Sequence, residues 1–104
     1  MTRNELARMI DLTAVRPDTT AQEVRELAAY ALDCRCAAVY THPTLTPLAL
    51  ELLGREPDIR VGGSVGFPSG AHTTATKVAE ARELIGMGCT ELDMVISLPL
   101  LLSG

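Results

Sequence analysis

Three short apolar segments alternate with two helix-patterned segments along most of this chain, and this alternation constrains the fold more than any other feature. The expected strands are residues 37–41, 59–67 and 90–96. Between them lie two helical patterns, one over residues 47–53 and one that begins at Thr73 or Thr74 and ends near Gly88. Strands separated by helices at such spacing pair in parallel through right-handed crossovers. We therefore predict an α/β fold with a parallel sheet of three strands.

The first third of the chain predicts two further helices joined by a loop. The motif Thr-x-x-Glu, which has the form of a capping box, occurs at residues 2–5 and 20–23, and helical apolar spacing follows each copy. Residues 11–18 are predicted to be a loop, because Pro17 disfavours helix at the residue before it. At the other end, residues 99–104 are expected to form a loop leading toward a further helix.

A parallel sheet covered by helices on one face only would leave its other face open to water. Something else must then cover that face. Three alternatives stay open: a second copy of this chain, a partner chain, or the rest of a longer barrel.

Composition excludes several classes of function. The 104 residues carry a formal net charge of −4, and the nine basic residues are scattered singly, so nucleic acid is not an expected partner. The longest apolar run, residues 94–102, is broken by Ser97 and Pro99 and is shorter than the roughly 20 residues of a membrane span. Residues 1–10 lack the apolar block of a signal peptide, so we expect a cytoplasmic protein without membrane contact.

The cysteines do not form a recognisable framework. Three is an odd number, which excludes a closed set of disulfides in a lone chain. Cys34 and Cys36 lie near His42, but no second Cys/His pair completes a metal site. We expect buried or half-buried free thiols, and neither a metal nor a cofactor.

Asp93 is the sharpest candidate for chemistry. It stands between the apolar residues Leu92 and Met94. A carboxylate removed from water without a partner is costly, so Asp93 is expected either to be paired or to serve in proton transfer. Glu91, two residues earlier on the same face, could share a proton with it, although a solvated position is the simpler interpretation.

The other polar candidates have simpler interpretations. Asp11 and Thr13 fit a local turn that satisfies backbone N–H groups, and they could also line a pocket. Lys77 is the only lysine, and it has no cationic neighbour one helical turn away, so we favour a solvated helix residue over a Schiff-base lysine. His42 and His72 have no neighbouring Ser or Cys at a spacing that suggests a triad.

Four motifs, taken together, resemble deoxyribose-phosphate aldolases. They are DLT at residues 11–13, a hydrophobic strand running into proline at residues 39–43, GFPSGAHTTATKV at residues 66–78 and ELDMV at residues 91–95. They occur in the order and at the spacing of that family, and they cover almost the whole chain.

The resemblance implies a fold and an activity. It implies the N-terminal three βα units of a TIM (β/α)8 barrel, preceded by a short N-terminal helix, with residues 1–104 as one partial domain. It also implies a class I aldolase that cleaves 2-deoxyribose 5-phosphate reversibly to acetaldehyde and glyceraldehyde 3-phosphate without a metal. Asp93 matches the family's proton-transferring aspartate, and Asp11, Thr13 and Tyr40 are the candidates for lining the substrate pocket. Lys77 matches a helix lysine of the family and not the nucleophile.

The family's imine-forming lysine belongs to later strands, which these 104 residues do not contain. We therefore expect no activity from the chain alone, and either a homo-oligomer or a C-terminal half supplied from elsewhere. The alternative is a non-catalytic half-barrel, or a subunit of a split enzyme, that associates with itself or with a partner. Two departures put the substrate in question: Tyr40 stands where members often have cysteine, and residues 97–99 replace the usual Asn-x-Gly.

Overall fold

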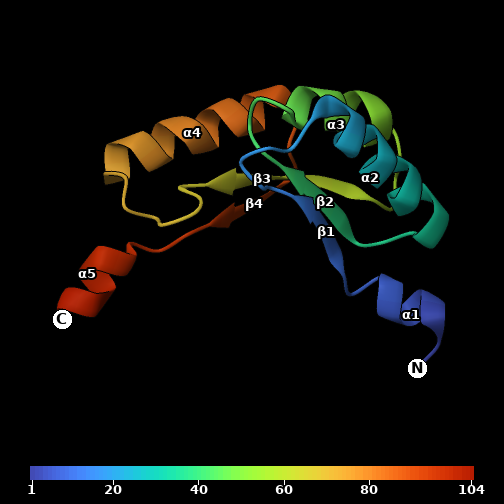
Figure 1. Ribbon diagram of the computed structural model, residues 1–104, viewed down its shortest axis with the longest axis horizontal. Helices are drawn as coiled ribbons and strands as arrows, with labels where there is room; N and C mark the ends of the chain where they lie inside the picture. The colour runs from blue at the N-terminus through green and yellow to red at the C-terminus, as the bar shows by residue number, and fades with distance from the viewer.

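The computed structural model covers residues 1–104 and contains a four-stranded parallel sheet and five helices (Figure 1). The strands lie in the sheet in chain order: β1 Asp11–Ala14, β2 Ala38–Thr41, β3 Arg60–Val65 and β4 Glu91–Met94. The helices are α1 Arg3–Ala7, α2 Ala21–Cys34, α3 Thr46–Leu53, α4 Thr74–Met87 and α5 Leu98–Ser103. The predicted α/β class and parallel pairing are confirmed.

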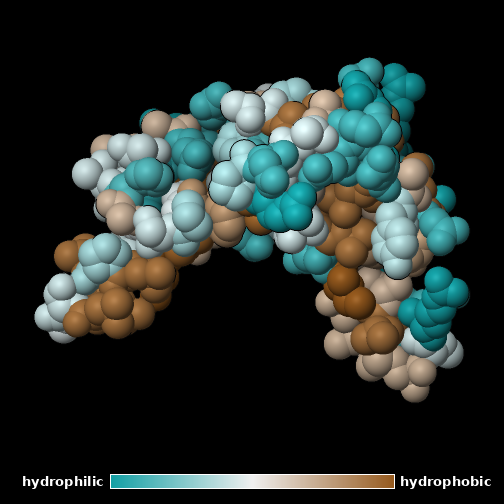
Figure 2. All heavy atoms as spheres, in the orientation of Figure 1, coloured by the Kyte–Doolittle hydropathy of each residue, from teal (hydrophilic) through white to brown (hydrophobic).

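Helices α2, α3 and α4 form a layer over one face of the sheet, and the other face carries no helix (Figure 1). The core lies between the two layers, where Val39 and Val61 of the sheet pack with Val24 of α2 and Leu53 of α3. Helices α1 and α5 lie at opposite ends of the molecule, and neither has a buried residue. In Figure 2 the surface of α5 is mostly hydrophobic, whereas the region of α1 is mixed. None of the helices is both long and apolar enough to cross a membrane.

The prediction of a loop over residues 11–18 is wrong, because the first four of these residues form β1. Asp11 to Ala14 pair in parallel with Ala38 to Thr41, and the ladder begins where the Ala37 N–H donates to the Ile10 carbonyl at 3.0 Å. Polar and apolar residues alternate along β1, which is the period-two pattern of a strand with one covered face. Pro17 restricts the backbone only at the residue before it, which lies beyond the end of β1. The sheet therefore has four strands instead of the three predicted.

The prediction of a loop over residues 99–104 is also wrong. Residues 98–103 form α5, with Ser97 as its N-cap, whose side chain accepts from the Leu100 N–H, and a proline in the first turn. The capping box at residues 2–5 is confirmed with both of its hydrogen bonds. The three cysteines are free, two of them buried and one half-buried, as predicted.

Candidate active site

The strand register gathers polar side chains on the face of the sheet that carries no helix. Thr13, Tyr40, Gly62 and Glu91 are register partners and form one row across all four strands. The rows on either side hold Asp11 with Arg60, and Ser64 with Asp93. Their sequence neighbours point to the helix layer, since side chains alternate along a strand. We call this helix-free surface the open face, and Asp11, Glu91 and Asp93 the acid cluster.

Tyr40 crosses the open face from β2 to β4. Its ring lies over Gly62 of β3, where an added Cβ would overlap the ring carbons and lie 2.7 Å from the hydroxyl oxygen. Only a residue without a side chain leaves that space, which accounts for glycine inside a strand. The Tyr40 hydroxyl thereby reaches Glu91 and donates to its Oε1 at 2.5 Å. Tyr40 is 1% exposed, so its side chain is enclosed by its neighbours.

Glu91 is bound from two sides, and the interpretation of Glu91 as simply solvated is wrong. Its Oε1 accepts from Tyr40, and its Oε2 accepts from the Arg60 Nε at 2.6 Å. The hydrogen bond from Tyr40 is the main reason that the pKa of Glu91 lies below its ordinary value, and Arg60 acts in the same direction. Glu91 is therefore an ionised, oriented carboxylate.

Asp11 and Thr13 lie exposed on the open face beside this network. The pKa of Asp11 is raised, first by partial burial and then by the negative charges of Glu91 and Asp93, while Arg60 opposes the shift. The structure therefore brings Asp11 of β1 together with the two acids of β4, from the opposite edge of the sheet.

Asp93 is not enclosed by its apolar sequence neighbours, contrary to the sequence-based expectation. Leu92 packs against the smaller hydrophobic cluster around Val65 and Leu84, on the helix side. Asp93 points the other way and is exposed on the open face, one row nearer the carboxyl ends of the strands than Glu91. That end of a parallel sheet is where βα-barrel enzymes hold their substrates. Asp93 is thus accessible to a ligand on the open face.

Lys77 is not the solvated helix residue that the sequence favoured. It is half-buried, and its Nζ donates to the Val95 carbonyl at 2.8 Å, at the end of β4. One helical turn later, Glu80 accepts the Gly66 N–H at 2.7 Å, at the end of β3. The two side chains of α4 therefore fasten the carboxyl ends of both strands.

We expect Lys77→Met to lower the free energy of unfolding by about 1 kcal/mol, because the Val95 carbonyl loses its charged donor. Urea unfolding followed by circular dichroism measures the change. Arg82→Met is the matched control, since Arg82 is exposed on the same helix. Equal effects of the two substitutions would contradict the role of Lys77 at the strand ends.

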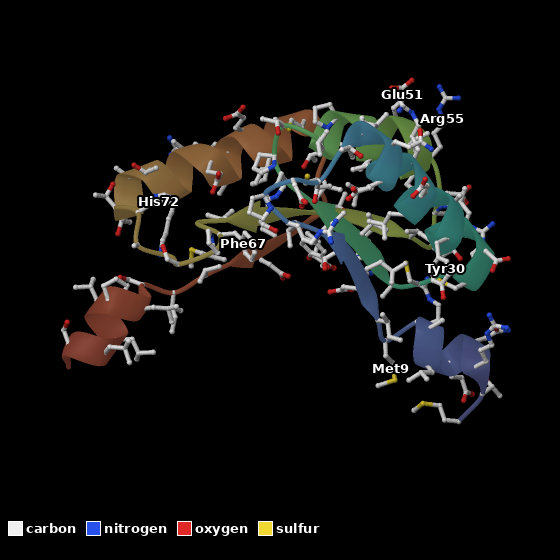
Figure 3. All side chains as sticks on the ribbon, viewed as in Figure 1. Met9, Tyr30, Glu51, Arg55, Phe67 and His72 are labelled. Carbon is white, nitrogen blue, oxygen red and sulfur yellow. The ribbon has the colours of Figure 1, made fainter.

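The two histidines and the two surface pockets lie away from the acid cluster. His42 shares a hydrogen bond of 2.8 Å with the Arg16 carbonyl, and His72 extends from the segment before α4 (Figure 3). An apolar hollow lies between α1 and α2 beside Tyr30 (Figure 3), and a second lies near Gly54 at the amino ends of the strands. None of the three acids lines either hollow, and no three His, Cys, Asp or Glu side chains are arranged to hold a metal ion.

Comparison with known sequences identifies relatives that are named deoxyribose-phosphate aldolase. The chain is 45% identical over 100 residues to the deoxyribose-phosphate aldolase of Sinorhizobium medicae, covering 96% of this chain and 40% of that protein. It is 40% identical over 99 residues to the deoxyribose-phosphate aldolase of Caldanaerobacter subterraneus, covering 95% of this chain and 42% of that one. No protein-family model matches the chain.

Comparison of structures agrees with the sequence relatives. The tetrameric deoxyribose-phosphate aldolase of Aeropyrum pernix superimposes with a TM-score of 0.82 at 31% identity, over 95% of this chain and 42% of that one. The α/β fold with its parallel sheet is therefore the fold found within that enzyme. This chain is a relative of the deoxyribose-phosphate aldolases, which are carbon–carbon lyases, and it spans about 40% of the length of the curated relatives that it matches.

Proposed function

We propose that this chain supplies the acid-bearing wall of a class I aldolase site that cleaves 2-deoxyribose 5-phosphate to acetaldehyde and glyceraldehyde 3-phosphate. One observation carries the proposal: the parallel register sets Asp93, within the ELDMV motif, on the open face beside Asp11 and Glu91. The names of the sequence relatives support the same substrate and reaction.

In this reaction a lysine amine and the substrate carbonyl condense to an imine and release water. Cleavage of the carbon–carbon bond requires that a proton leave the hydroxyl group on the carbon that becomes the aldehyde of glyceraldehyde 3-phosphate, and that the remaining enamine carbon then gain a proton. Water finally hydrolyses the resulting imine, which releases acetaldehyde and restores the lysine amine. We assign this proton transfer to Asp93, acting with water, because its carboxylate is exposed near the carboxyl ends of the strands. Asp11 and Thr13 would line the pocket on the β1 side, and Tyr40 would form its wall.

We further propose that residues 1–104 form part of one (β/α)8 barrel domain. Both β1 and β4 have a single strand neighbour, so each sheet edge is free to pair with further parallel strands. The imine-forming lysine would come from those strands, because the amine of Lys77, the only lysine here, is bound to a backbone carbonyl. The tetramer described for the Aeropyrum pernix enzyme supports a complete enzyme that is also oligomeric.

Borohydride trapping tests this division of roles. The chain is incubated with 2-deoxyribose 5-phosphate and sodium borohydride, and intact-mass spectrometry then detects any reduced imine. We expect no adduct on the isolated chain, and an adduct on the added polypeptide once the remaining segment of the Sinorhizobium medicae aldolase is supplied. An adduct at Lys77 would contradict the proposal.

A non-catalytic role in association is the second candidate, and the surface of α5 favours it. Leu100, Leu101 and Leu102 are 74%, 61% and 84% exposed, an unusual apolar surface for a protein in water. In that case the chain would bind a second copy or a partner, and the trapping mixture would contain the complex but no adduct.

A further inference from the structure

The network of Tyr40, Glu91 and Arg60 has a feature that the proposed proton transfer does not use. Glu91 makes both of its hydrogen bonds to donors of other strands, one from β2 and one from β3. Asp11 and Asp93, the other two acids of the open face, have no comparable donors within the chain. The three acids are therefore held differently, although they share one surface.

We propose that Tyr40 is a positioning residue that, together with Arg60, holds Glu91 as the oriented carboxylate of the acid cluster, whose charge acts on the neighbouring Asp11. This inference rests on the proposed function, because it states which side chains orient one acid of that same site.

The geometry around Tyr40 supports a fixed donor. The ring is enclosed, lies over Gly62 and cannot leave Glu91 without moving across β3. Burial, followed by the hydrogen bond to Glu91, raises the pKa of the Tyr40 phenol, so the hydroxyl keeps its proton and stays a donor. A phenol has one proton to donate, and here it is aimed at a single carboxylate oxygen.

The charges on the open face make the acids differ in how readily they ionise. The charged and titratable groups that face Glu91 are Tyr40, Arg60, Asp11 and, on its own strand, Asp93. Like charges on one surface oppose one another's ionisation, and the acid with the best donors ionises first. The charge held on Glu91 is one cause of the raised pKa of Asp11. Tyr40 therefore acts on Asp11 through Glu91.

Carboxyl titration by NMR tests this role in the isolated chain without any turnover. With 13C-labelled aspartate and glutamate, we expect Tyr40→Phe to move the titration midpoint of Glu91 upward, because the ring over Gly62 is kept and only the hydroxyl is lost. We expect Glu91→Gln to move the midpoint of Asp11 downward, because a neighbouring charge disappears. The amide spectrum of each variant reports whether the fold is intact.

Tyr30→Phe is the matched control, because Tyr30 is 60% exposed and lies on α2, in the layer on the opposite side of the sheet. It should leave both midpoints unchanged. An unchanged Glu91 midpoint in Tyr40→Phe, or an unchanged Asp11 midpoint in Glu91→Gln, would overturn the inference. Neither result would bear on the role of Asp93, which is measured by turnover, so the inference and the proposed function fail separately.

Discussion

Gly70→Ala is expected to lower the free energy of unfolding by about 3 kcal/mol or more, the sum of backbone strain and overlap with neighbouring atoms. Gly70 has a φ of +66°, a conformation that alanine adopts only with strain. An added Cβ would also overlap the Ile96 carbonyl and lie 2.6 Å from the Val95 carbonyl oxygen. These neighbours are backbone atoms, which cannot rotate away.

The effect should reach the open face, because Gly70 belongs to the contact between the segments that follow β3 and β4. The Gly70 N–H donates to the Gly66 carbonyl at 2.7 Å, and the Leu98 N–H donates to the Ser69 carbonyl at 3.3 Å. The second segment begins directly after the strand that carries Asp93. A natural domain is stable by only about 5–15 kcal/mol, so such a loss is a substantial part of the total.

Urea unfolding of Gly70→Ala and of the parent chain measures the difference. Gly86→Ala is the control, since Gly86 is exposed in α4 and an added Cβ there meets no atom within 4 Å. That change should be neutral or stabilising by up to about 1 kcal/mol, because alanine favours helix. A Gly70→Ala variant as stable as the parent would show that the segments after β3 and β4 are not locked together.

The sequence predicted those elements that carry strong local signals. Ile59, Val61 and Val65 mark β3, α1 begins with a complete capping box, and Gly88 ends α4. β1 was missed because it has only four residues and one large apolar side chain, Leu12. Its stability comes from pairing with β2, some 27 residues later in the register (Asp11 with Ala38), which no local pattern reports. Its period-two alternation was the available signal.

The candidate site was predictable only in part, for the same reason. Asp93 could be found because a carboxylate inside a strand is unusual. The roles of Glu91 and Tyr40 depend on three strands in register and on the space over Gly62. Glycine within a strand signalled that something approaches there, but the sequence does not say that it is a tyrosine ring. Lys77 was misjudged because its partner, the Val95 carbonyl, is a backbone group of a distant segment.

A chimera makes the role of Asp93 measurable. In the chimera, this chain takes the place of the 100 matching residues of the Sinorhizobium medicae aldolase, which are 40% of that protein. The remaining strands come from the relative. We expect Asp93→Asn to lower kcat by a factor of about 10²–10⁴, the usual contribution of a general acid–base group. Asparagine keeps the size of the side chain and loses the ability to carry a proton. Asp33→Asn, an exposed change on α2, should leave kcat unchanged.

The kcat of the Asp93→Asn chimera for cleavage of 2-deoxyribose 5-phosphate, compared with that of the unsubstituted chimera, is the most direct measurement of what the open face does. We predict an active parent chimera and a loss of at least about a hundredfold on substitution. An inactive parent that is folded, or an Asp93→Asn chimera as fast as its parent, would contradict the assignment of proton transfer to this face of the sheet.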